Sequence, residues 1–134
     1  MDYSGEFLSH ARVYVLADYY NIPRLMELST TKLENSLDGY LVLFSEDEKQ
    51  VCKAIENFVE LLEYSYANTV DKGGEQDLLR KVITERAATW IHVLEPHKEF
   101  QRALVRFGEM GKDIISNLLR QFIPSTSSLV EEGG

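Results

Sequence analysis

Apolar residues in the first part of the chain recur with the period of helices rather than of strands. The run over 5–20 is apolar round most of its circumference, and a helix of this kind has to be covered by other elements. The run over 22–37 carries an apolar stripe at steps of three and four, which is typical of an amphipathic helix. We therefore expect a tight helical hairpin over 5–37, around which the later helices pack.

The junction of the two runs, Asp18–Pro23, leaves almost no room for a loop. Asn21 can cap the second helix, because its side-chain oxygen can accept a hydrogen bond from an amide of the first turn. Pro23 is tolerated there since the first amides of a helix have no intrahelical partner. The junction thus predicts that the second helix begins directly after the first one ends.

The later pattern predicts four more helices, over about 45–66, 75–95, 97–107 and 108–123. Ser45 and Glu48 form a capping box at the start of this set. Tyr40–Phe44 is the only β-like stretch, and we interpret it as an extended or one-turn helical connector, because a lone strand leaves its backbone groups unpaired. Gly73-Gly74 marks the clearest linker.

Together these elements predict an all-α bundle of about six helices with short connections. We expect a single helical domain over 1–124, with the hairpin at 5–37 and the following helices at 45–123. Residues 125–134 are Ser-rich, acidic and Gly-ended, and we expect them to form a disordered tail.

The charge of the chain restricts the partners that it can bind. A length of 134 residues suffices for one domain that needs neither disulfides nor metal, and the formal net charge of −8 disfavours nucleic acid as a partner. Acidic residues concentrate between Asp38 and Asp77, where the sequence holds ten of them and only three lysines. Such a run is usually a solvated helix face. It can also steer a basic partner, and the binding is then sensitive to salt.

Cysteine usage and hydropathy indicate the compartment. Cys52 is the only cysteine, and it lies on an apolar helical stripe beside Ile55, where we expect a small buried hydrophobic side chain. A lone cysteine favours a reducing, intracellular location, either cytoplasmic or nuclear. No apolar run approaches the roughly 20 residues of a membrane span, and the N-terminus lacks the features of a signal peptide, so we expect no membrane partner.

The hairpin sequence reads HARVYVLADYY at 10–20, followed by IPRL at 22–25. This run resembles the helical second half of a BTB/POZ domain of the fungal type. The later helices are also similar, including the sequence GEMG at 108–111, and the resemblance covers roughly residues 3–122. It implies a non-catalytic protein–protein interaction module.

A complete domain of that family begins with an α/β half that this sequence does not contain. The residues YSGEF at 3–7 look like the segment that usually ends that half. The family's usual dimer interface lies mainly in the missing half, as does the loop with which cullin adaptors grip their cullin. A substrate adaptor of a cullin-type ubiquitin ligase therefore stands as an alternative to the simple interaction module.

Candidate partner-binding residues lie at the end of the first helix and on the polar face of the second. They are Tyr19, Tyr20, Arg24, Glu27, Thr31 and Asn35. Tyrosine is favoured at interfaces, and the last four residues follow helical spacing. The expected partner is another protein, or a second copy bound through the apolar hairpin face that the missing half would cover.

No catalytic or cofactor-binding residues are expected, because the sequence holds neither a nucleophile elbow nor a phosphate-binding glycine motif. A small metal-dependent enzyme remains as a second alternative. His92 and His97 would supply ligands, with oxygens from Glu95 and Glu99. The two histidines are five residues apart with Pro96 between them, whereas zinc-binding pairs on one helix face prefer three or four. We therefore expect no metal site.

Overall fold

A computed structural model describes residues 4–38 and 47–122. Those residues form seven helices and no strand: α1 (Ser4–Tyr19), α2 (Pro23–Asp38), α3 (Glu48–Asn68), α4 (Leu78–Thr89), α5 (Ile91–Leu94), α6 (Lys98–Arg106) and α7 (Gly108–Phe122). The all-α fold and the N-terminal hairpin are confirmed. The predicted connector at 40–44, the Ser45 cap and the tail at 125–134 lie outside the described residues.

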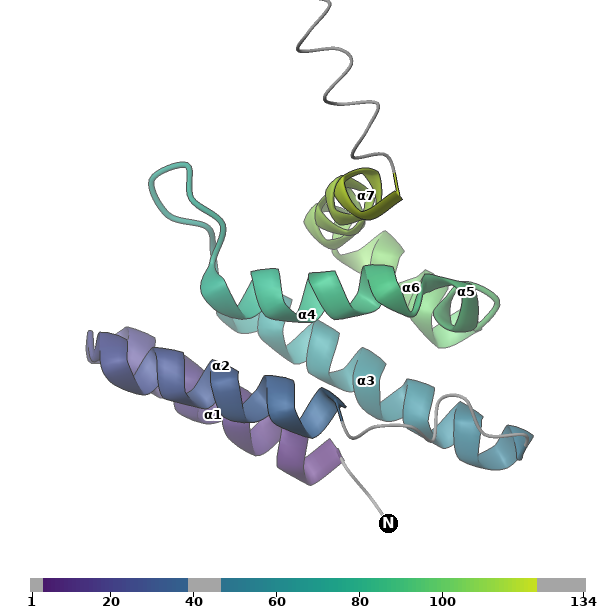
Figure 1. Cartoon of the computed structure of the whole chain (residues 1–134), viewed down its shortest axis with the longest axis horizontal. Coiled ribbons are helices and arrows are strands. Elements are labelled where there is room, and N and C mark those ends of the chain that lie inside the picture. Colours follow the sequence, from purple (N-terminus) through teal and green to yellow (C-terminus); the bar gives the residue numbers. More distant parts are fainter. Residues whose placement is uncertain (1–3, 39–46, 123–134) are drawn as a thin grey trace, which may run out of the picture.

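The helices pack in three layers (Figure 1). The α1–α2 hairpin forms one outer layer, α3 and α4 form the middle layer, and α6 and α7 lie on the other side. Within this arrangement α1 packs on α3 and α2 on α4, while α6 packs on α3 and α7 on α4. The middle layer therefore supplies about half of the core, with fully buried side chains such as Phe58, Leu62 and Ile83.

The turn between α1 and α2 differs from the predicted cap. Asn21 has a positive φ of 56°, the left-handed conformation that commonly follows the last residue of a helix. The amide of Ile22 donates to the carbonyl of Ala17 at 2.8 Å, and the amide of Asn21 donates to the carbonyl of Asp18 at 3.2 Å. This pair of bonds is a Schellman motif. Asn21 thus ends α1 rather than capping α2, and α2 begins at Pro23, one residue after the predicted start at Ile22.

The buried residues of the hairpin include small and hydroxylated ones. Ala11 and Ala17 are buried on α1, and Ser29 and Thr30 are buried on α2. The Ser29 hydroxyl donates to the carbonyl of Met26 at 2.9 Å, and the Thr30 hydroxyl also bonds a carbonyl of the preceding turn. Because both hydroxyls are satisfied within α2, they can be buried without leaving an unpaired polar group.

The predicted single helix over 75–95 is wrong, because it divides at Trp90. This residue has φ −97° and ψ 15°, outside the helical region, and it separates α4 from α5. Its buried indole packs edge-to-face against Phe58 of α3, with the ring centroids 5.1 Å apart. A break at this position lets the bulky ring reach the core and starts α5 in a new direction.

The segment before α4 forms a miniature hairpin rather than a flexible linker. Gly73 and Gly74 both have positive φ, as the two central residues of a type I′ turn require. Lys72 and Glu75 exchange two backbone hydrogen bonds, at 3.2 and 2.9 Å. Glu75 belongs to this turn and Asp77 is the N-cap of α4, so α4 starts only at Leu78 rather than near Glu75.

Arg80 joins three parts of the fold from a nearly fully buried position. Its guanidinium donates to the backbone carbonyls of Tyr66 and Thr69, and its Nε donates to the Thr69 hydroxyl at 3.0 Å. It also stacks on the Tyr66 ring, 4.2 Å from the centroid, and pairs with Glu109 of α7. Because carbonyls at the end of a helix lack intrahelical partners, Arg80 acts as the C-terminal cap of α3.

The start of α3 corrects one further expectation. Asp47 is the N-cap, and its carboxylate accepts a hydrogen bond from the amide of Lys49 at 3.0 Å. Cys52 is exposed, so the prediction of a buried cysteine is wrong. The reason is that burial on α3 begins only at Ala54, past the first turn of the helix.

Candidate protein-binding surface

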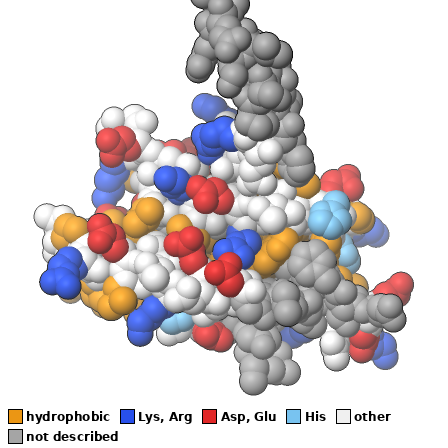
Figure 2. Space-filling view, in the orientation of Figure 1, with side chains coloured by type: hydrophobic (Ala, Val, Ile, Leu, Met, Phe, Trp, Pro, Cys, Tyr) orange, Lys and Arg blue, Asp and Glu red, His pale blue; other side chains and the backbone are white. Residues whose placement is uncertain are grey.

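The end of the hairpin exposes a group of large apolar side chains. Leu16 is 55% exposed and Tyr19 80%, and Tyr20 and Ile22 are also exposed. We call these four residues the tip surface. Figure 2 shows apolar side chains, interspersed with charged ones, at the left end of the molecule, where the hairpin lies. A group of exposed apolar residues with a charged rim is typical of a binding site.

The tip surface is exposed because the rest of the fold covers only one side of α1. The buried side of α1 includes Phe7, Ala11, Tyr14 and Ala17, at steps of three and four. Leu16 lies on the other side, which faces no described element. The sequence therefore correctly predicts that α1 is apolar nearly all round, but only one side of the helix finds a partner within the described part of the chain.

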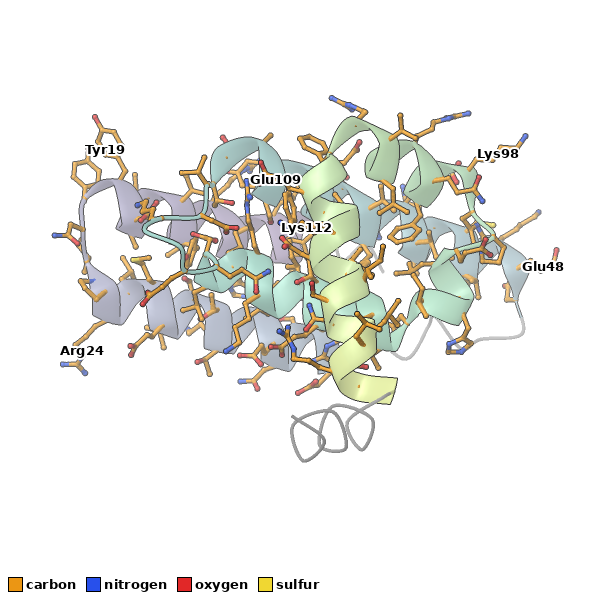
Figure 3. The ribbon with its side chains drawn as sticks, turned by 90° about the horizontal axis from the view of Figure 1, so that it is seen from above. Tyr19, Arg24, Glu48, Lys98, Glu109 and Lys112 are labelled. Atoms are coloured by element: carbon orange, nitrogen blue, oxygen red, sulfur yellow. The ribbon has the colours of Figure 1, made fainter. Side chains whose placement is uncertain are left out.

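The six candidate residues lie in two groups, all of them exposed. The first comprises Tyr19 and Tyr20, whose rings meet edge to face with centroids 5.0 Å apart, and Arg24 in the first turn of α2. Figure 3 places Tyr19 and Arg24 at the same end of the molecule, each pointing away from it. The second group continues along α2: Glu27, Thr31 and Asn35.

The sequence did not single out four exposed apolar residues of the hairpin, Val13, Leu16, Ile22 and Leu28. Leu28 lies between Arg24 and Thr31 on the exposed side of α2. The sequence did indicate that Leu28 is exposed, because it lies four residues after Arg24 and three before Thr31 and so falls on the polar face of the helix. For Leu16 no such signal existed, since apolar residues surround the whole of α1.

Two long-range contacts hold the last turns of α1 against the segment before α4. Asp18 forms an ion pair with Lys72, at 2.8 Å, and the Tyr14 hydroxyl donates to the Asp77 carboxylate at 2.9 Å. Val70, in the same segment, is exposed and adds an apolar side chain near this end of the molecule. The tip surface is thus supported by the body of the fold and does not depend on the hairpin alone.

The Tyr14–Asp77 contact is electrostatically unusual. Burial raises the pKa of the Asp77 carboxyl, while hydrogen bonds from the Arg80 amide and from Tyr14 act in the opposite direction. Burial also raises the pKa of the Tyr14 phenol, and the neighbouring Asp77 charge raises it further. The pKa of Tyr66 is raised in the same way, by burial and by its hydrogen bond to Asp113.

We expect the free energy of unfolding to fall as the pH rises through 10.0, the ordinary pKa of a phenol. Above that pH the unfolded chain releases the protons of Tyr14 and Tyr66, while the native chain keeps them, so deprotonation favours unfolding. Denaturant unfolding at about pH 8 and about pH 11 measures the loss. Tyr14→Phe should reduce this loss, since one of the groups whose pKa is raised in the native chain no longer titrates. An undiminished loss in this variant would contradict the assignment.

The structure also bears on metal and membrane binding. His92 is exposed on α5, and His97 precedes α6. Within residues 4–38 and 47–122, no three His, Cys, Asp or Glu side chains come close enough to hold a metal ion. In the same ranges, no helix combines the length and the apolar character that a bilayer crossing requires.

What the geometry offers chemically is surface contact: aromatic rings, aliphatic side chains and a guanidinium at one end of a rigid hairpin. The chain matches no protein-family model, no curated protein and no solved structure.

Proposed function

We propose that the chain is a non-catalytic protein–protein interaction module that binds another protein through its tip surface. The observation that carries this proposal is the exposure of four large apolar side chains at one end of the hairpin, two of them tyrosines in mutual contact. A second copy of the chain is the other occupant that such a surface can accept.

The residue types of the tip surface suit this role. Tyrosine supplies a large contact area with only two side-chain torsions, so that little entropy is lost when it is ordered in a complex. Arg24 lies beside the tyrosines and can pair with an acidic group of the partner at the edge of the contact. An apolar centre with aromatic and arginine anchors is the usual composition of binding hot spots.

The sequence resemblance to BTB/POZ proteins supports the same role, because that family acts by binding proteins and the likeness is strongest over the hairpin. The cullin-adaptor alternative depends on a loop outside the matched region. The resemblance therefore supports an interaction module and gives no support for cullin binding.

Leu16→Ser should weaken partner binding by about tenfold or more, because it removes a large apolar side chain from the proposed contact. Leu119→Ser on α7 is a matched control, since Leu119 is 53% exposed, almost the same as Leu16. The full chain is used to isolate binders from a cell extract, and the affinity of each purified binder for the two variants is measured by calorimetry.

The supporting result is a binder that loses affinity for Leu16→Ser and for Tyr20→Ser but not for the control. Thermal unfolding should be unchanged in all three variants, because substitutions of exposed residues are nearly neutral for stability. Binders with the same affinity for all three variants as for wild type would refute the proposal. Binders that lose affinity for the control alone would also refute it, because the contact would then lie elsewhere.

A further inference from the structure

Two oppositely charged stripes run side by side on α3 and α6. Glu56, Glu60 and Glu63 form the acidic stripe on α3, while Lys98, Arg102 and Arg106 form the basic stripe on α6. The two helices border an open groove of about 290 Å³ that is lined by all three glutamates, by Arg102 and Arg106, and by Val59 and Glu99, while Lys98 lies beyond its lining. In Figure 3 Glu48 and Lys98, at the starts of the two helices, lie at the same end of the molecule, so α3 and α6 run in parallel.

Most of these charges form no ion pair within the described part of the chain. Arg106 pairs with Glu63 across the groove, at 3.1 Å. Lys98, Arg102, Glu56 and Glu60 make no ion pair with any of the described residues. The spacing of four residues along the basic stripe also brings like charges together, which weakens an isolated helix. Each stripe therefore gains from an additional partner of opposite charge.

We propose that this face binds the same face of a second copy, so that the basic stripe of each copy lies on the acidic stripe of the other. A two-fold axis that lies along the groove, in the plane of contact, exchanges the two sides of the groove. The axis places the α6 of one copy opposite the α3 of its partner. A two-fold axis across the groove would instead place like charges opposite each other, and the charges therefore select one orientation.

The same symmetry fixes the register. The Glu63–Arg106 ion pair shows that these two residues lie level along the groove. One helical turn back, about 6 Å, Arg102 lies level with Glu60, and a further turn back Lys98 lies level with Glu56. Because rotation about an axis along the groove preserves position along it, Arg102 of each copy meets Glu60 of the other.

The composition of the contact indicates a weak, reversible dimer. Exposed ion pairs add little free energy each, and the net charge of −8 on each copy opposes association. Val105 of α6 is 85% exposed and lines a neighbouring hollow together with Lys98, Arg102 and Arg106, so it can add an apolar side chain at the edge of the contact. The tip surface lies outside this groove, so dimerisation leaves it accessible and the two proposals can fail separately.

Sedimentation velocity of the full chain over a concentration series tests the proposal. Wild type should show a reversible monomer–dimer equilibrium. Arg102→Glu and Glu60→Arg should each weaken it by about tenfold or more, because the two-fold axis makes every reversal act twice. The double variant Glu60→Arg/Arg102→Glu should restore dimerisation, and an equimolar mixture of the two single variants should form a heterodimer.

Lys32→Glu and Glu34→Arg on α2 are matched controls, since both residues are exposed and the changes in net charge are the same. A wild-type chain that stays monomeric at every concentration would overturn the proposal. So would a double variant that fails to dimerise although its circular dichroism melt matches wild type, or controls that weaken the dimer as much as the groove variants.

Discussion

Arg80→Met is expected to lower the free energy of unfolding by roughly 2–4 kcal/mol. Methionine is of similar length and fills much of the same space, but it donates no hydrogen bond. The carbonyls of Tyr66 and Thr69 then lose their donor at the buried end of α3, and the stacking on the Tyr66 ring is lost as well. Chemical denaturation followed by far-UV circular dichroism measures the change.

Glu109→Gln is the control that separates the buried cap from the surface ion pair. Glu109 is 71% exposed, so water replaces the lost charge and the expected change is below about 1 kcal/mol. If the two variants were equally unstable, the ion pair to α7 and not the carbonyl cap would be the main contribution of Arg80.

The second large effect is expected at Phe58. Phe58→Ala should lower the free energy of unfolding by about 3–5 kcal/mol, because it leaves a cavity between α3 and the α4–α5 break. Trp90 is the only tryptophan, so its fluorescence reports on the same contact. We expect its emission to shift to longer wavelength in the native state of the variant, as water gains access to the indole.

Phe58→Leu keeps most of the volume and should recover the larger part of the lost stability. Val105→Ala, at an exposed position on α6, should leave both stability and emission unchanged. A native emission spectrum in Phe58→Ala that matches wild type would contradict the close packing of the two rings.

The elements predicted from the sequence are those that the period of the apolar residues determines locally. The α1–α2 hairpin follows from its two apolar runs, and α6 and α7 follow from the stripes on either side of Gly108. The division at Trp90 was not predictable in this way, since no glycine or proline marks it. The division depends on the contact of Trp90 with Phe58, which is far from it in the sequence.

The contacts of single polar residues were the least predictable from the sequence. Arg80 occupies a position of α4 that reads as an ordinary surface arginine, yet it is buried because unpaired carbonyls of α3 lie beside it. For the candidate surface, the sequence indicated Tyr19 and Tyr20 at the end of the first helix and the polar face of α2. It could not indicate which side of α1 remains uncovered, because that depends on where α3 packs.

The Schellman turn at Asn21 has a consequence for recognition. Two backbone hydrogen bonds close the junction, and the ion pair of Asp18 with Lys72 fixes the end of α1 from outside the hairpin. The aromatic pair is therefore displayed on a preorganised support, and a docking protein loses little conformational entropy in ordering it. Changes in affinity among variants of this end should accordingly appear in the dissociation rate more than in the association rate.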